Sequence, residues 1–234
     1  MGKRLDLVRR RPDVSPERFA GELLERVGPA LLTADPRPVR LSVDVAQPGQ
    51  ELLARRGLRT DRATYDAAVW RWYEAGDPSQ RAGVLDAGDL LAPVLSFRLE
   101  EHIGWEYERD WPDGTPTPGV KQISMLTAAA GYGTDEFRRH YRHHVALTRK
   151  HMPAVWRYVQ NDVAAGSGEG CEGIVAVSEL YFRSVDDFLE RYFPTEEDRR
   201  TFVANEGFLD LPRAFSVMCN ECILESGPGE PAPR

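Results

Sequence analysis

VWRYVQNDVAAGSGEGCEGIVAVSELYF, residues 155–182, contains two apolar runs on either side of a loop rich in glycine. Short runs rich in β-branched and aromatic residues and bounded by turn residues are typical of strands. No helix follows the GSGEG of residues 166–170, so these glycines predict a flexible hairpin loop rather than a phosphate-binding turn. The stretch therefore predicts two adjacent strands.

Segments on both sides of this hairpin complete a larger unit. Residues 119–129 form a strand-like run, and residues 131–151 have the apolar spacing of a helix. After the hairpin, residues 185–206 are predicted to be helical and residues 215–225 to form a last strand. The order β-α-β-β-α-β predicts a ferredoxin-like unit.

The first half of the chain repeats this order with weaker signals. Ser15 followed by Pro16 is typical of a helix start, and this helix is expected over residues 15–32. The other elements are expected as strands at residues 5–10, 39–47, 65–73 and 94–108 and as a short helix at residues 79–91. The repeat therefore predicts a second ferredoxin-like unit.

Two such units in one chain can bury their apolar sheet faces against each other. The predicted fold class is α+β, with two units packed sheet to sheet as an intramolecular α+β barrel. We expect a degenerate first half (1–110), a linker rich in proline and glycine (111–119), a second half that carries the site (120–225) and a disordered tail (226–234).

Composition limits the classes of function. The net charge of −7 leaves neither half basic, which disfavours nucleic-acid binding. No apolar run approaches the roughly 20 residues of a membrane-spanning helix. The three cysteines are an odd number, which with no sign of secretion predicts a cytoplasmic protein. The expected partner is a small molecule, and the chain is expected to be a monomer with an internal pseudo-dimer or a homodimer.

Several short motifs resemble the EthD-like branch of the dimeric α+β barrel superfamily. The resemblance covers residues 119–225 and is looser in the first half. It is carried by Thr134–Phe137, Tyr141 with His144 three residues later, Met152–Pro153, Arg157–Asn161 and Glu179–Phe182.

Most EthD-like proteins are about one unit long, so the resemblance implies a fused pair. The first half has no histidine where His144 stands in the second, which implies one competent site per chain. Superfamily relatives include cyclases, decarboxylases and cofactor-free oxygenases that act on polyketide-like aromatics, and others bind haem.

Four of the five histidines lie between residues 140 and 151. On a helical wheel of roughly 100° per residue, one face is basic and must be solvated. The inward stripe is then expected to contain Phe137, His140, His144, Leu147 and His151.

His144 is the candidate general acid or base, because imidazole titrates near neutral pH. The alternative is an ordinary hydrogen-bonded core histidine. His151 is expected to cap the helix end, and His143 to lie on the surface.

Other candidates come from the strands and the same helix. Tyr141 or Tyr158 could hydrogen-bond a substrate carbonyl or phenol. Glu179 could orient His144 or act as a base with a raised pKa, or it could form a salt bridge to a strand arginine such as Arg157. The residues predicted to bind substrate are His140, Trp156, Tyr158, Asn161, Glu221, Trp70 and Trp72.

No metal or other cofactor is expected. His140 and His144 have a spacing that can bind zinc, but the HExxH pattern is missing, and a third ligand would have to come from Glu179 or Glu221. No dinucleotide, P-loop or serine-hydrolase motif is present. The predicted function is a cofactor-free bacterial tailoring enzyme that cyclises, dehydrates or decarboxylates an aromatic or polyketide-like substrate. The alternatives are a haem- or metal-binding protein and a non-catalytic ligand-binding protein.

Overall fold

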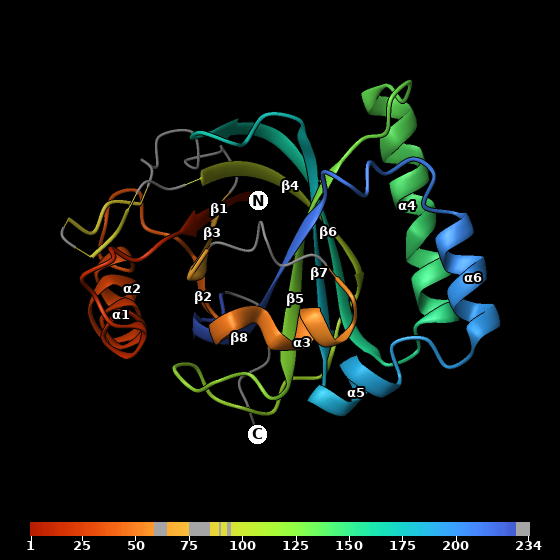
Figure 1. The fold of residues 1–234 in the computed structure, drawn as a ribbon. Helices are drawn as coiled ribbons and strands as arrows, with labels where there is room; N and C mark the ends of the chain where they lie inside the picture. Colours follow the sequence, from red (N-terminus) through yellow and green to blue (C-terminus); the bar gives the residue numbers. More distant parts are fainter. Residues whose placement is uncertain (59–64, 75–84, 89, 93–94, 228–234) are drawn as a thin grey trace.

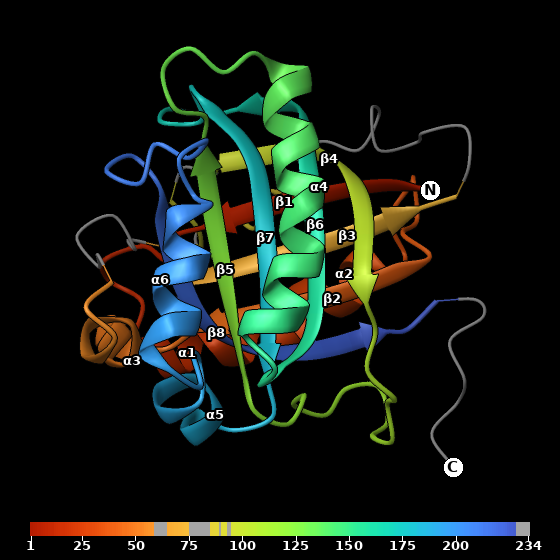
Figure 2. The same cartoon turned by 90° about the vertical axis from the view of Figure 1, so that its right-hand side faces the viewer.

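Eight antiparallel strands close into one barrel in the computed structural model, which describes residues 1–58, 65–74, 85–88, 90–92 and 95–227 (Figures 1 and 2). The strands are β1 (Gly2–Val8), β2 (Arg40–Ala46), β3 (Ala67–Tyr73), β4 (Leu95–Trp105), β5 (Val120–Thr127), β6 (Val155–Ser167), β7 (Ile174–Phe182) and β8 (Phe215–Glu225). All eight lie where the sequence predicts them, with shifts of a few residues at the ends.

The strand order around the barrel is β1-β3-β2-β8-β5-β7-β6-β4. Two seams join the halves: β2 pairs with β8, and β4 pairs with β6. Inside the barrel the apolar inner faces of the two halves share one core cluster, which includes Trp70 and Phe97 of the first half and Ile123 and Val177 of the second. The sequence did not predict that the halves also pair along their sheet edges. Edge pairing satisfies backbone N–H and C=O groups that a separate sheet would expose.

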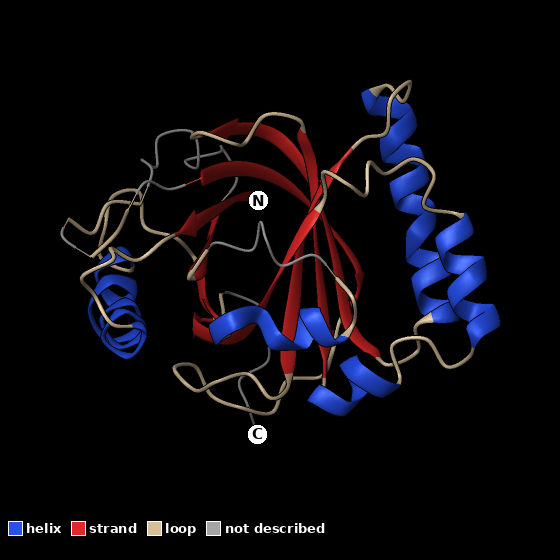
Figure 3. Ribbon diagram, in the orientation of Figure 1, coloured by secondary structure: helices blue, strands red, loops and turns tan. Residues whose placement is uncertain are grey.

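Helices lie outside the ring of strands (Figure 3). In the first half, α1 (Pro16–Glu22) continues through the π-helix η1 (Leu23–Val27) into α2 (Gly28–Leu31). Ser15 caps α1 as predicted, because its hydroxyl accepts a hydrogen bond of 3.2 Å from the Arg18 amide. Most of the helix expected at residues 79–91 and most of the expected tail lie outside the described residues.

The long helix α4 (Thr134–His151) covers the outer face of the second half, with α6 (Glu196–Ala204) beside it and α5 (Val185–Glu190) below (Figure 2). Its buried stripe is Phe137, Tyr141, His144, Thr148 and His151. The expected stripe is thus corrected by about 40°, which brings in Tyr141 and Thr148 and leaves His140 and Leu147 half-buried on its flank.

A short segment of the first half crosses to the second. It contains the 3₁₀ turn η2 (Pro48–Gln50) and α3 (Glu51–Arg55). The buried Gln50 side chain donates to the Met218 carbonyl oxygen (3.1 Å) and accepts from the Met218 amide (2.5 Å). Leu53 then packs into the apolar cluster that contains Phe182 and Phe188. This segment connects the two halves next to β8 and α5 (Figure 1).

Candidate active site

A cavity of about 550 Å³ lies between α4, the segment that follows α6 and the outer face of the second half's sheet. A volume of this size suits a small organic ligand. Its apolar lining includes Leu126, Leu180, Phe202, Phe208, Leu211 and Phe215, and its polar lining includes Tyr141, His144, Tyr158, Ser178, Tyr192 and Glu206.

His144 is buried in the cavity wall, 5% exposed. Its Nε2 lies 3.1 Å from the Asn205 carbonyl oxygen. A carbonyl oxygen only accepts hydrogen bonds, so Nε2 carries the proton and Nδ1 holds the lone pair of the neutral ring. The ring meets Phe202 and Phe208 edge to face.

Burial lowers the pKa of His144, and the hydrogen bond to Asn205 opposes part of that shift. The neighbouring His140 and His143 lower it further. The imidazole is therefore neutral at pH 7, which is the state that can accept a proton.

Two tyrosines and a serine form the polar floor of the cavity. The Tyr141 hydroxyl and the Ser178 Oγ are 2.7 Å apart, and the Tyr158 hydroxyl accepts a hydrogen bond of 3.0 Å from Gln160. Burial raises the pKa of Tyr141 well above its usual value and also raises that of Tyr158. Both phenols stay protonated and can donate to a ligand oxygen.

Glu206 and Tyr192 also line the cavity, and the sequence gives no sign of either. Glu206 was expected inside a helix, but α6 ends at Ala204 and a turn brings the carboxyl group back to the cavity. Burial raises the pKa of Glu206 to about 7. Burial also raises the pKa of Tyr192, and the charge of Glu206 adds to that shift.

The first half contributes to the same cavity. Gly57 and Leu58, which follow α3, lie in its wall beside Tyr192. The guanidinium group of Arg56 stacks on the Tyr192 ring at 4.3 Å from its centroid. The corresponding outer face of the first half is packed with the apolar side chains Phe19, Leu23, Val27, Leu41 and Val43.

Glu179 lies on the other side of β7 from His144. Successive side chains of a strand point to opposite faces, so Ser178 and Leu180 reach the cavity while Glu179 points into the barrel. There it lies 2.6 Å from Lys3 Nζ and 2.9 Å from Lys121 Nζ.

The interpretation of Glu179 as a base with a raised pKa is therefore corrected. Burial alone would raise the pKa of Glu179, but Lys121 and Lys3 hold it well below its usual value. Its ion-pair partners are lysines, and Arg157 binds Glu106 and Tyr181 instead.

Four predicted substrate-binding residues also lie inside the barrel. Glu221 pairs with Lys121 at 3.1 Å, and Asn161 donates to Glu179 at 3.0 Å. The indole N–H of Trp70 donates to Asp44 and that of Trp72 to Glu101, at 2.6 and 3.1 Å. None of these four side chains lines the cavity, because the barrel wall separates them from it.

The other predicted residues also lie outside the cavity lining. His140 stacks on Phe208 with ring centroids 5.7 Å apart and does not line the cavity itself. Trp156 packs on Tyr107 in a separate groove. His151, expected to cap the helix, is instead 2.8 Å from Asp198 of α6, and His143 is exposed as predicted.

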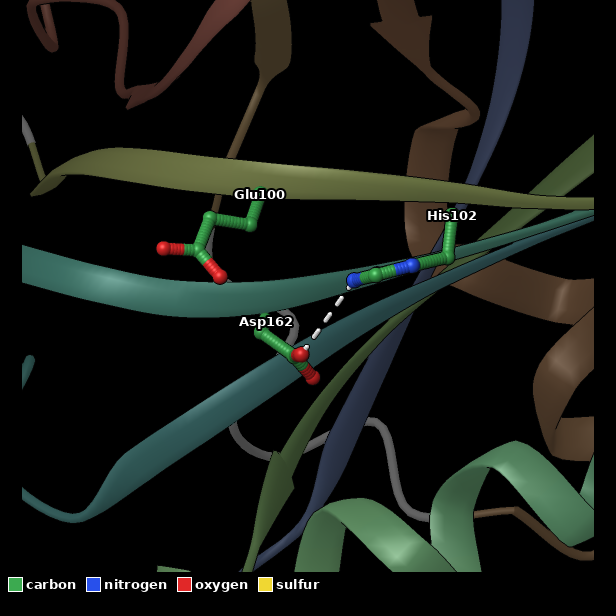
Figure 4. A group of neighbouring side chains, drawn as sticks. All are labelled: Glu100, His102 and Asp162. Atoms are coloured by element: carbon green, nitrogen blue, oxygen red, sulfur yellow. Dashed lines mark ion pairs between the residues drawn. The ribbon is translucent and has the colours of Figure 1, made fainter. Parts of the chain in front are cut away.

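Within the described residues, one group of histidine and carboxylate side chains converges closely enough for a metal ion: Glu100, His102 and Asp162 (Figure 4). His102 Nε2 is 3.5 Å from Asp162 Oδ2. That carboxylate is already neutralised by Arg142, with Arg138 at 3.5 Å. The group therefore functions as an ion-pair cluster that ties α4 to β6, and the pair His140 and His144 is not part of it.

The fold and site define an α+β barrel with a ligand-sized cavity on the outer face of its second half. Residues 129–209 match the family described as the EthD domain, and this stretch contains both His144 and Glu206. The predicted resemblance is thereby confirmed for this part of the chain. No curated protein sequence matches the chain.

Solved structures share the fold over nearly the whole chain. An anthrone oxidase-like protein superposes with a TM-score of 0.60 at 13% identity, over 100% of this chain and 96% of that one. Candidate monooxygenases of Lactobacillus acidophilus and Fusobacterium nucleatum give TM-scores of 0.52 and 0.53 at 7% and 8% identity. These two cover 97% and 99% of this chain and 96% and 95% of their own. At these identities the similarity establishes the fold alone.

None of the helices in the described part of the chain is long and apolar enough to cross a membrane.

Proposed function

We propose that the chain is an enzyme that uses acid/base chemistry to tailor an aromatic or polyketide-like carbonyl compound, without a cofactor. The observation that carries the proposal is the hydrogen bond between His144 Nε2 and the Asn205 carbonyl oxygen. It fixes the ring so that Nδ1 is the basic nitrogen, in a cavity with apolar walls. A neutral imidazole fixed in this way can remove a proton from a bound substrate.

Proton removal next to a carbonyl group is a first step shared by cyclisation, dehydration and decarboxylation of keto compounds. The phenols of Tyr141 and Tyr158 supply donors that would stabilise the enolate oxygen formed in that step. The apolar walls suit a flat ring system. We also propose that this enzyme is cytoplasmic and belongs to bacterial secondary metabolism.

Anthrone is a suitable probe, because it is a flat tricyclic ketone whose ring methylene is acidic and because one structural neighbour is described as anthrone oxidase-like. Exchange of the methylene protons in D₂O under nitrogen, followed by NMR, reports proton removal alone. We expect wild type to accelerate this exchange, and the exposed control His143→Ala to keep the wild-type rate. Exchange no faster than in buffer would contradict the proposal.

Haem or metal binding is less well supported. Of the two histidines whose spacing suits zinc, His140 does not line the cavity, so Nδ1 of His144 is left as the one histidine ligand that the described lining could offer. A Soret band after addition of haem would favour this alternative. Stabilisation by anthrone without proton exchange would favour a non-catalytic binding protein.

We also infer that the barrel is a fusion of two ferredoxin-like units. Strand order supports this, because β4-β1-β3-β2 and β8-β5-β7-β6 follow the same sequence of positions. Buried side chains match as well: Lys3 lies opposite Trp72 as Lys121 lies opposite Tyr181. In the same register, Arg40 faces Trp72 as Arg157 faces Tyr181. The first half would then have lost its site and kept a structural role.

A further inference from the structure

Glu206 occupies the turn directly after the residue that holds His144. The Glu206 amide donates to the Val203 carbonyl oxygen (3.1 Å), and its own carbonyl accepts from the Leu209 amide (2.8 Å). These bonds fix the backbone of Asn205 and Glu206 as one turn. Asn205 binds His144, and Glu206 lines the cavity. A single turn therefore positions the His144 imidazole and the Glu206 carboxyl group, each of which can transfer a proton to or from a ligand.

The surroundings of the Glu206 carboxyl group are mostly apolar. Phe202, Phe208 and Leu209, its near neighbours in the sequence, also line the cavity. In the part of the chain that the structure describes, the carboxyl group forms no hydrogen bond or ion pair, and no lysine or arginine lines the cavity. The other titratable groups of the lining are His144 and the phenols of Tyr141, Tyr158 and Tyr192.

A half-buried carboxyl group without a cation resists ionisation. Burial raises its pKa to about 7, and the nearby Arg56 guanidinium stacks on the Tyr192 ring. At neutral pH a large fraction of Glu206 is therefore a carboxylic acid that can donate a proton. His144 has the opposite perturbation and is neutral under the same conditions. Two groups whose environments push their pKa values in opposite directions form a typical acid and base pair.

We propose that Glu206 is the general acid of this site, donating its proton to the carbonyl oxygen of a flat enolisable ketone while His144 removes a proton from carbon. This inference rests on the proposed function and adds a general acid to the base, His144. It identifies the substrate class as ketones with an acidic C–H bond conjugated to the carbonyl group.

The proton balance of the step is complete. The C–H bond breaks, its proton moves to His144 Nδ1, and its electron pair forms the C=C bond of the enol. The carbonyl π electrons take the proton of Glu206, which becomes a carboxylate. The product is an enol with an imidazolium and a carboxylate in place of imidazole and carboxylic acid. Nothing is oxidised or reduced, and the reverse step restores both residues.

The test compares Glu206→Gln with wild type in the anthrone exchange assay between pH 5 and 9. Glutamine keeps the size and a hydrogen-bond donor but cannot transfer a proton. We expect a loss of about 100-fold in the exchange rate, the lower end of the range typical of general acid catalysis. The fall in rate of wild type as pH rises through 7 should disappear in the variant. Glu197→Gln, at an exposed position of α6, is the matched control and should match wild type.

The outcomes separate the two proposals. Exchange that is lost in His144→Ala but unchanged in rate and pH profile in Glu206→Gln would overturn the role of Glu206 and leave the base in place. If ¹³C NMR showed that the Glu206 carboxyl group titrates near pH 4.5, that result would also overturn the role of Glu206, independently of any substrate. Wild-type exchange no faster than in buffer would count against the proposed function itself.

Discussion

Ser178 and Glu179 are neighbours in β7, and their side chains point to opposite sides of the barrel wall. Ser178 Oγ lies 2.7 Å from the Tyr141 hydroxyl in the cavity, and Glu179 Oε1 lies 2.6 Å from Lys3 Nζ inside the barrel. The wall thus separates a cavity with few charges from an interior in which charges are densely paired. The two regions should respond differently to mutation.

Removing a lysine from the interior should destabilise the protein. Lys121 lies within 3.1 Å of Asp44, Glu179 and Glu221, and Lys121→Met would leave these buried carboxylates without their shared cation. Breaking a buried ion pair costs roughly 3–5 kcal/mol. Chemical denaturation measures the effect, with the exposed Lys150→Met as control. A variant as stable as its control would show that the interior charges contribute little.

Phenylalanine at position 141 should impair catalysis more than stability. Tyr141→Phe removes the hydroxyl that meets Ser178, which costs about 1 kcal/mol as a lost hydrogen bond. If that hydroxyl also stabilises an enolate, the exchange rate should fall about 10- to 100-fold, somewhat less than for loss of a dedicated oxyanion donor. Tyr132→Phe, outside the cavity lining, should keep the wild-type rate. Equal rates in both variants would remove Tyr141 from the site.

Glu206→Gln should stabilise the protein at neutral and alkaline pH. The folded-state pKa of Glu206, about 7, lies above the usual 4.5, so the contribution of its protonated form is full below pH 4.5 and is lost as pH rises through 7. Glutamine does not titrate and avoids that loss. The difference in unfolding free energy should grow from near zero at pH 4 to roughly 1–3 kcal/mol above pH 8. A difference independent of pH would contradict the raised pKa.

A mutation in the segment of η2 and α3, which crosses between the halves, should weaken ligand binding more than it slows turnover. Gln50→Ala leaves the backbone groups of Met218 without their side-chain partner and loosens the wall formed by Gly57 and Leu58. A loss of about 1–3 kcal/mol in local stability should raise the dissociation constant for anthrone several-fold. Gln47→Ala, which removes a hydrogen bond to the exposed Asn220, is the control. Unchanged affinity in Gln50→Ala would argue against a role for the first half in the site.

The sequence predicts the strands well because each is a short apolar run between turn residues, as in residues 155–182. It also predicts that His144 faces inward, since a basic helix face must be the solvated one. It could not distinguish the cavity side of the sheet from the barrel interior, because both faces of a closed barrel under helices are buried. Ser178 and Glu179 therefore look alike as candidates until the register is known.

The other cavity residues that the sequence did not predict reach the site through contacts between distant segments. Glu206 reaches the cavity only because α6 ends at Ala204 and the chain turns back toward α4. Leu58 belongs to the first half by sequence and to the second half's cavity by position. Local propensity carries no information about either contact.

Chemical rescue in the anthrone exchange assay tests the role of His144 most directly. In His144→Ala, exchange should fall roughly 10²- to 10⁴-fold, and added imidazole should restore part of it by entering the space left by the ring. The exposed His143→Ala should show neither effect. Wild-type exchange in His144→Ala without imidazole, with the protein still folded, would contradict the assignment of His144 as the base.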